Sequence, residues 1–171
     1  TRMQSVLFVC LGNICRSPLA QGVFEHKIRL AGLESEYDAD SAGTSGWHQG
    51  EPPHSGSIAV AKKYGIAIER QKSRPVHAKD GEIFDYIIAM DTANRESLIH
   101  EFRFPQEKVF LMRDFDERQR ADLLDGKPAI LGEDVFGGGL EASLDVGDAG
   151  GLNGLQLFCF YCHNYSPTLK S

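Results

Sequence analysis

The apolar and polar residues of the chain are arranged in two different patterns. Residues 3–9 form a compact apolar run typical of a buried strand, whereas residues 17–31 repeat apolar side chains at helical spacing until Gly32. Strands are predicted at residues 3–9, 37–41, 84–89 and 108–112. Helices are predicted at residues 17–31, 55–64 and 92–101, the last of them capped by Asp91 or Thr92.

This order of strands and helices predicts an α/β fold. Strands that are separated by helices pair in parallel, and the helices cover the sheet. We therefore expect a single domain over residues 1–171, built on a four-stranded parallel sheet with helices on both faces. Ligands of such sheets bind at the carboxyl ends of the strands, and Cys10 directly follows the first predicted strand.

The last part of the chain departs from this pattern. Its glycines stand at positions 137, 138, 139, 147, 150, 151 and 154. Each glycine costs a helix about 1 kcal/mol relative to alanine, so residues 145–171 are expected to form an atypical tail. The segment Cys159–His163 matches short redox and haem-attachment patterns. Neither pattern has its usual context here, which favours two ordinary apolar cysteines.

The segment Cys10–Pro18, with the sequence CLGNICRSP, joins the first strand to the first helix. A loop that leads into a helix N-terminus stabilises a thiolate or a phosphate, because its N–H groups and the helix dipole favour negative charge. Arg16 adds a full positive charge and can hold two phosphate oxygens at once. The backbone amides of residues 11–16 can form a nest around an oxyanion.

The other residues of this segment agree with an anion site. Gly12 lets the backbone approach an anion, Asn13 tolerates a left-handed conformation, and Ser17 can donate a hydrogen bond to the Cys10 sulfur. A lone cysteine here would more often be a buried residue at a strand end, but the combination predicts a phosphate site. Its candidate phosphate-binding residues are Leu11, Gly12, Asn13, Ile14, Cys15, Arg16 and Ser17.

The segment Val6–Pro18 resembles the phosphate loop of the low-molecular-weight protein tyrosine phosphatases. Asp40–His48 with Gly50–Pro53 is similar to the second strand and the following loop of the bacterial members of that family, and Phe84–Asp91 with Asn94 to its third strand and the next helix start. The resemblance covers about residues 3–140 and implies the family's α/β fold.

The resemblance also implies an activity and a set of roles. It implies hydrolysis of phosphotyrosine and aryl phosphate monoesters through a cysteinyl-phosphate intermediate, without metal or cofactor. Cys10 would be the nucleophile and Arg16 the phosphate clamp, and isoleucine at position 14 goes with phosphotyrosine in this family. The loop network would consist of Asn13, Ser17 and Ser41. The substrate crevice would consist of Leu11, Ile14, Trp47 and Phe136.

The family's general acid is an aspartate in a late loop, and its nearest match here is Asp134 in the sequence DVFGGG. Phe136 matches one of the two aromatic residues that follow the aspartate in the family. Val135 replaces the usual proline and Gly137 the second aromatic residue, so this loop departs from the family pattern. Other carboxylates stand nearby, at Asp114, Asp116, Asp122, Asp125, Glu133 and Asp145.

Two alternative functions and the role of Cys15 stay open at this point. The same fold and loop occur in arsenate reductases, although residues 66–100 contain none of the relay cysteines that such an enzyme needs. The altered acid loop would also suit a weakened phosphate-binding module. Cys15 is either a small buried residue or a partner that forms a disulfide with Cys10 under oxidation.

Composition limits the partners and the compartment. The net charge of −6 argues against nucleic acid and confines anion capture to the loop itself. No apolar stretch reaches the ~20 residues that span a bilayer, and the first apolar run is too short for a signal peptide. We expect a cytoplasmic monomer that acts on a phosphotyrosine-containing protein and is inhibited by inorganic phosphate or vanadate.

Overall fold

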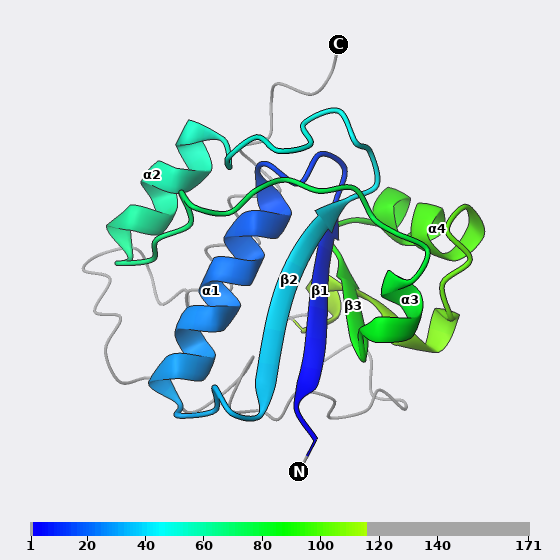
Figure 1. Ribbon diagram of the computed structural model, residues 1–171, viewed down its shortest axis with the longest axis horizontal. Coiled ribbons are helices and arrows are strands. Elements are labelled where there is room, and N and C mark those ends of the chain that lie inside the picture. Colours follow the sequence, from blue (N-terminus) through cyan, green and yellow to red (C-terminus); the bar gives the residue numbers. More distant parts are fainter. Residues whose placement is uncertain (1, 116–171) are drawn as a thin grey trace. The chain divides into compact units, whose positions relative to one another are not determined.

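The computed structural model describes residues 2–115 (Figure 1). Its strands are β1 (Gln4–Cys10), β2 (Tyr37–Gly43), β3 (Tyr86–Ala89) and β4 (Val109–Leu111). Its α-helices are α1 (Arg16–Leu30), α2 (Ser55–Lys63), α3 (Asp80–Ile83) and α4 (Thr92–His100). Short 3-10 helices span η1 (Gln106–Lys108) and η2 (Met112–Phe115).

The chain divides into two compact units, Thr1–Met112 and Arg113–Ser171. The sheet and all four α-helices belong to the first unit. The expected atypical tail at residues 145–171 lies outside the described residues, and the single domain over residues 1–171 stays a prediction.

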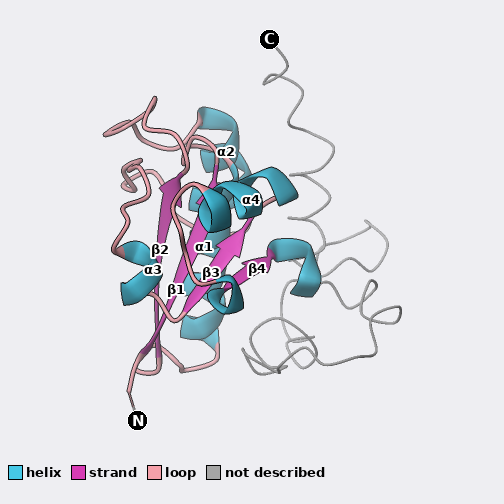
Figure 2. Cartoon of the chain, turned by 90° about the vertical axis from the view of Figure 1, so that its right-hand side faces the viewer, coloured by secondary structure: helices cyan, strands magenta, loops and turns pink. Residues whose placement is uncertain are grey.

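The four strands pair in parallel in the order β2-β1-β3-β4. β1 is central: Cys10 pairs with Gly43 at the end of β2, and Val9 pairs with Ala89 at the end of β3. Because the strands are parallel, their carboxyl ends meet at one edge of the sheet. Figure 2 shows the loops after β1 and β2 gathered at that edge, where Cys10 ends its strand.

Both faces of β1 are buried, and alternate side chains pack against different helices. Phe8 packs on Phe24 of α1, with the ring centroids 5.6 Å apart. Leu7 and Val9 point to the other face, where they share a buried cluster with Leu98 of α4. The prediction of a four-stranded parallel sheet with helices on both faces is therefore confirmed, and Figure 1 shows α1 and α4 on opposite sides of β1.

The helix boundaries follow from particular residues. Gly32, just after α1, has φ +69°, a left-handed conformation that ends helices and that glycine adopts without steric cost. Asp91 caps α4, because its Oδ1 accepts a 2.8 Å hydrogen bond from the Asn94 N–H. The seven predicted elements begin and end within two residues of their observed bounds, but α3 was not predicted. A helix of four residues is too short to show periodicity.

Among the described residues, no helix combines the length and the apolar character needed to cross a membrane.

Candidate active site

The Cys10 thiol lies at the floor of the loop that follows β1. Cys10 is only 3% exposed. The Ser17 hydroxyl oxygen lies 3.0 Å from its sulfur, and the Asn13 N–H donates to the same sulfur at 3.2 Å. The Asn13 N–H is a donor to the sulfur, whereas in the contact with Ser17 either the thiol or the hydroxyl can be the donor.

The carbonyls of this loop are held from outside by other parts of the chain. Thr44 N–H donates to the Cys10 carbonyl at 2.9 Å, and Ser45 donates to the Leu11 carbonyl through its N–H and its hydroxyl at 2.9 and 3.0 Å. The Ser73 hydroxyl donates to the Gly12 carbonyl at 3.0 Å. The His54 N–H donates to the Ile14 carbonyl at 2.6 Å.

These bonds set the direction of the loop's amides. In a trans peptide the C=O and the next N–H point in opposite directions, and no described peptide bond is cis. Because four carbonyls face outward, the amides that follow them face the other side of the loop. Those amides belong to Leu11, Gly12, Asn13 and Cys15. This is the backbone arrangement that an anion nest requires, and phosphate binding at residues 11–17 stays a prediction.

Asn13 is the conformational centre of the loop. Its φ is +53°, in the left-handed region that few residues other than glycine adopt. Its buried side-chain amide donates to the hydroxyls of Ser17 and Ser41, both at 2.9 Å, and its Oδ1 accepts from the Arg74 N–H at 2.9 Å. The structure thus brings the predicted network of Asn13, Ser17 and Ser41 into direct contact.

Arg16 opens α1, and its guanidinium is directed to Asp91. The Arg16 Nη1 lies 2.6 Å from the Asp91 Oδ2, and the arginine side chain is 20% exposed. The Asn94 amide, with its nitrogen toward Asp91, also reaches the two carboxylate oxygens at 3.0 and 3.2 Å. The sequence predicted Asp91 or Thr92 as the helix cap, and the cap is Asp91, but the sequence did not predict the ion pair of Asp91 with Arg16.

Cys15 is a free thiol like Cys10, but it lies in a different environment. Burial raises the pKa of the Cys15 thiol, and a negative charge on Cys10 raises it further. A hydrogen bond with Ser57 and the charge of Arg16 act in the opposite direction without cancelling the shift. The environment of Cys15 therefore disfavours its thiolate form.

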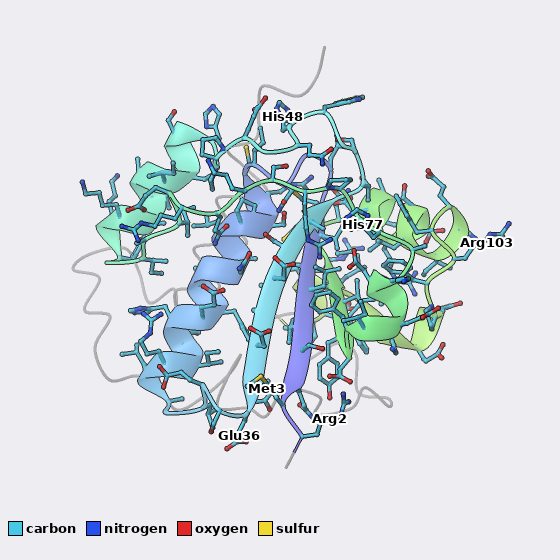
Figure 3. All side chains as sticks on the ribbon, in the orientation of Figure 1. Arg2, Met3, Glu36, His48, His77 and Arg103 are labelled. Carbon is cyan, nitrogen blue, oxygen red and sulfur yellow. The ribbon has the colours of Figure 1, made fainter. Side chains whose placement is uncertain are left out.

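The predicted crevice residues that the structure describes differ in burial. Leu11 and Ile14 are half-buried, whereas Trp47 is 77% exposed on the loop after β2. His48 packs on Gly12, because a Cβ added there would lie 3.1 Å from the histidine Cδ2. The His48 ring pairs with Glu51 at 2.8 Å, and Figure 3 shows it at the end of the sheet where β1 and β2 finish.

Arg74 was not singled out by the sequence, although it braces the same loop. Its guanidinium pairs with Asp40 of β2 and with the buried Asp80 of α3, both at 2.9 Å. Burial alone would lower the Arg74 pKa, but the hydrogen bonds and charges of Asp80 and Asp40 raise it. The side chain thereby fixes the backbone N–H that holds Asn13.

Some predicted site residues lie outside the described residues. They are Asp134, Phe136 and the segment Cys159–His163. Within residues 2–115, no group of three His, Cys, Asp or Glu side chains is arranged to hold a metal ion.

The chain matches a known protein family over most of its length. The model of the low molecular weight phosphotyrosine protein phosphatase family matches residues 5–137. A low molecular weight protein-tyrosine-phosphatase of Bacillus subtilis, YfkJ, is 51% identical over 96 residues, which are 56% of this chain and 62% of that protein. A low molecular weight phosphotyrosine protein phosphatase of Schizosaccharomyces pombe is 39% identical over 139 residues, which are 80% and 88% of the two chains.

Solved structures show the same similarity. The crystal structure of YfkJ from Bacillus subtilis superimposes with a TM-score of 0.68 at 36% identity, covering 95% of this chain and 92% of that one. A protein tyrosine phosphatase from Entamoeba histolytica superimposes with a TM-score of 0.62 at 43% identity, over 66% and 72% of the two chains.

Proposed function

The chain belongs to the low molecular weight phosphotyrosine protein phosphatase family, whose members are cysteine-dependent hydrolases, and from this we propose that it hydrolyses phosphotyrosine through Cys10. One observation carries the proposal: the Cys10 sulfur accepts a hydrogen bond from the Asn13 N–H and lies 3.0 Å from the Ser17 hydroxyl, inside a loop whose carbonyls are turned outward. That arrangement suits a thiolate beneath a bound phosphoryl group.

In the first step the Cys10 thiolate attacks phosphorus in line with the ester oxygen. The S–P bond forms as the P–O bond breaks, and Asp134 gives its proton to the departing phenolate oxygen. The amides of the loop and the Arg16 guanidinium stabilise the charge on the three equatorial oxygens. Asp134 is proposed as the acid because its loop resembles the loop that carries the general acid in this family.

In the second step water releases the phosphate. The Asp134 carboxylate, left ionised by the first step, accepts a proton from the water as its oxygen attacks phosphorus and the S–P bond breaks. The departing sulfur is again a thiolate. The Ser17 hydroxyl, 3.0 Å from the sulfur, is placed to donate to it.

The substrate is proposed to be a phosphotyrosine-containing protein. Leu11, Ile14, Trp47 and Phe136 would form the walls that receive the aromatic ring. Apolar side chains beside an oxyanion loop favour an aryl ester over an alkyl one, because the ring loses water on binding. We also propose a monomer in a reducing cytoplasm, inhibited by phosphate and by vanadate, since both anions fit the same nest.

The test is turnover of p-nitrophenyl phosphate against pH by the full chain and by Cys10→Ser and Asp134→Ala. Cys10→Ser should be inactive, while Asp134→Ala should keep a burst of phenol release with much slower turnover. Full activity of Cys10→Ser would refute the mechanism. Unchanged turnover of Asp134→Ala would move the acid to a neighbouring carboxylate. Thiol consumption that depends on arsenate, without any phenol release, would indicate a reductase instead.

A further inference from the structure

Ser73 lies far from the phosphate loop in sequence but touches it in the fold. Its hydroxyl donates to the Gly12 carbonyl at 3.0 Å, across 61 residues of chain. The residue is only 5% exposed. Among residues 2–115, the Gly12 carbonyl accepts one hydrogen bond, from this hydroxyl. The Leu11 carbonyl accepts two.

The bond fixes the peptide that donates to the nucleophile. The Gly12 carbonyl and the Asn13 N–H belong to one trans peptide and point in opposite directions. With the carbonyl held by Ser73, the N–H is directed to the Cys10 sulfur at 3.2 Å. If this peptide turned over, a carbonyl oxygen would face the thiolate and repel it.

The intrinsic preference of the backbone opposes the observed orientation. A turn of this peptide changes ψ of Gly12, which glycine tolerates, and φ of Asn13, which would leave its unfavourable value of +53°. The native orientation is therefore a strained one that its surroundings must hold in place. The Asn13 side chain is held through Arg74, Ser17 and Ser41, and the carbonyl through Ser73.

Ser73 itself is held by the loop that carries Trp47 and His48. Its N–H donates to the Glu51 carbonyl at 2.9 Å, and its carbonyl accepts from the Gly50 N–H at 2.8 Å. The connection between α2 and α3, which contains Ser73, runs beside the loop after β1 in Figure 1. One residue thus joins the candidate ring-binding loop to the nucleophile loop.

We propose that Ser73 is a positioning residue for the reaction: its hydroxyl locks the Gly12–Asn13 peptide in the orientation that stabilises the Cys10 thiolate and the bound oxyanion. This rests on the proposed function, in which Cys10 is the nucleophile. The contact requires a hydroxyl donor at position 73 and not merely a side chain of the right size.

The experiment compares wild type with Ser73→Ala in the full chain. It measures the rate of Cys10 alkylation by iodoacetamide at one mildly acidic pH and the dissociation constant of orthovanadate. Losing the donor should slow alkylation and weaken vanadate binding, each by about tenfold. Ser73→Thr and Ser73→Val are nearly equal in shape, so threonine should recover both properties and valine should not. This pair tests the hydroxyl even where alanine destabilises the fold.

Ser5→Ala is the matched control. The Ser5 hydroxyl donates to the Ile83 carbonyl and lies 3.2 Å from the Asp85 carboxylate, at the opposite end of β1 from Cys10. Removing it should lower the melting temperature without changing alkylation or vanadate binding. The proposal is wrong if Ser73→Ala behaves like wild type, or if the threonine and valine variants lose both properties equally. Neither readout needs turnover, so an inactive wild type would reject the proposed function and leave this test intact.

Discussion

The Asp91 carboxylate serves two partners with its two oxygens. Oδ1 caps α4 through the Asn94 N–H at 2.8 Å, and Oδ2 holds the Arg16 guanidinium at 2.6 Å. Because Asp91 ends the connection after β3, the cap fixes the carboxylate relative to the sheet. A single residue thus links the start of α4 to the orientation of the Arg16 side chain, the proposed phosphate clamp, on α1.

Asp91→Asn separates these two roles. Asparagine caps helices about as well as aspartate, and a partly exposed ion pair adds little stability, so the free energy of unfolding should change by about 1 kcal/mol or less. Turnover of an aryl phosphate should nevertheless fall roughly tenfold in kcat/KM, because Arg16 loses its charged anchor. Asp91→Ala should lose the cap as well and cost about 1 kcal/mol more. Wild-type kcat/KM in Asp91→Asn would show that Arg16 needs no such anchor.

The two thiols of the loop should differ in reactivity. Because burial raises the pKa of Cys15 above its usual value of 9.0, little of this thiol ionises at neutral pH. In Cys10→Ser, alkylation of Cys15 should therefore be slow at neutral pH, and its rate should increase only as the pH approaches and exceeds 9.0, the usual pKa of the thiol. Mass spectrometry of the peptide containing Cys15 measures it, with the urea-unfolded chain as the control. Equal labelling of the folded and unfolded chains at neutral pH would contradict the burial argument.

At the scale of elements, α1 is placed by a glycine that faces a loop. A Cβ at Gly22 would lie 2.4 Å from the Ile68 Cγ2 and 3.1 Å from the Ile66 Cγ2. Ile68 is 1% exposed, so other residues enclose its side chain. This contact sets how closely α1 approaches the connection between α2 and α3, which also contains Ser73 and Arg74.

Gly22→Ala should destabilise the protein, although alanine is the better helix former. The helix gains about 1 kcal/mol from alanine, but overpacking against a buried β-branched side chain costs about 1–3 kcal/mol. We expect a lower urea midpoint and a lower melting temperature. In an Ile68→Ala background the same substitution should be clearly less destabilising, since the methyl at 2.4 Å is gone and only the 3.1 Å contact with Ile66 remains. A stabilised Gly22→Ala single variant would mean that α1 can shift away.

The elements could be predicted because their patterns are local. β1 is buried on both faces and therefore appears as an uninterrupted apolar run, and Gly32 and Asp91 mark helix ends by their own chemistry. The proposed phosphate loop is a local pattern too, since its proposed nucleophile, its proposed clamp and its left-handed residue lie within seven positions, from Cys10 to Arg16.

The residues that hold the loop could not be predicted in this way. Ser73 and Arg74 act across 61 residues, one through a single hydroxyl and the other through a backbone N–H. A backbone donor leaves no mark on the residue type, and a lone serine in a loop has many ordinary uses. Only the path of the connection between α2 and α3, which depends on the whole fold, brings them to Gly12 and Asn13.

At the scale of the whole molecule, the net charge of −6 opposes the approach of a phosphate. The proposed binding of phosphate must therefore come from local geometry. It would rely on the inward amides of the loop, the N-terminus of α1 and the planar guanidinium of Arg16. A substitution that keeps the net charge but changes this geometry should reveal whether charge or geometry contributes more to anion binding.

Orthovanadate should raise the melting temperature of the wild-type chain. A ligand at 100 times its dissociation constant adds about 2.7 kcal/mol to stability, which is roughly 5–10 °C for a protein of this size. Arg16→Lys keeps the charge but cannot hold two oxygens in a plane, so the shift should shrink by more than half. Sodium chloride at matched ionic strength is the control. An equal shift in both proteins would assign binding to charge alone.

The outward carbonyls of the phosphate loop have a consequence for how such an enzyme can change. The amides that face the anion are main-chain groups, and their direction is set by partners behind the loop, at Thr44, Ser45, His54 and Ser73. The side chains of Leu11 and Ile14 take no part in those bonds. In the proposed crevice, mutation at these two positions would therefore alter which alcohol is accepted without changing the reaction at phosphorus, so that substrate range and reaction type would vary independently within one short loop.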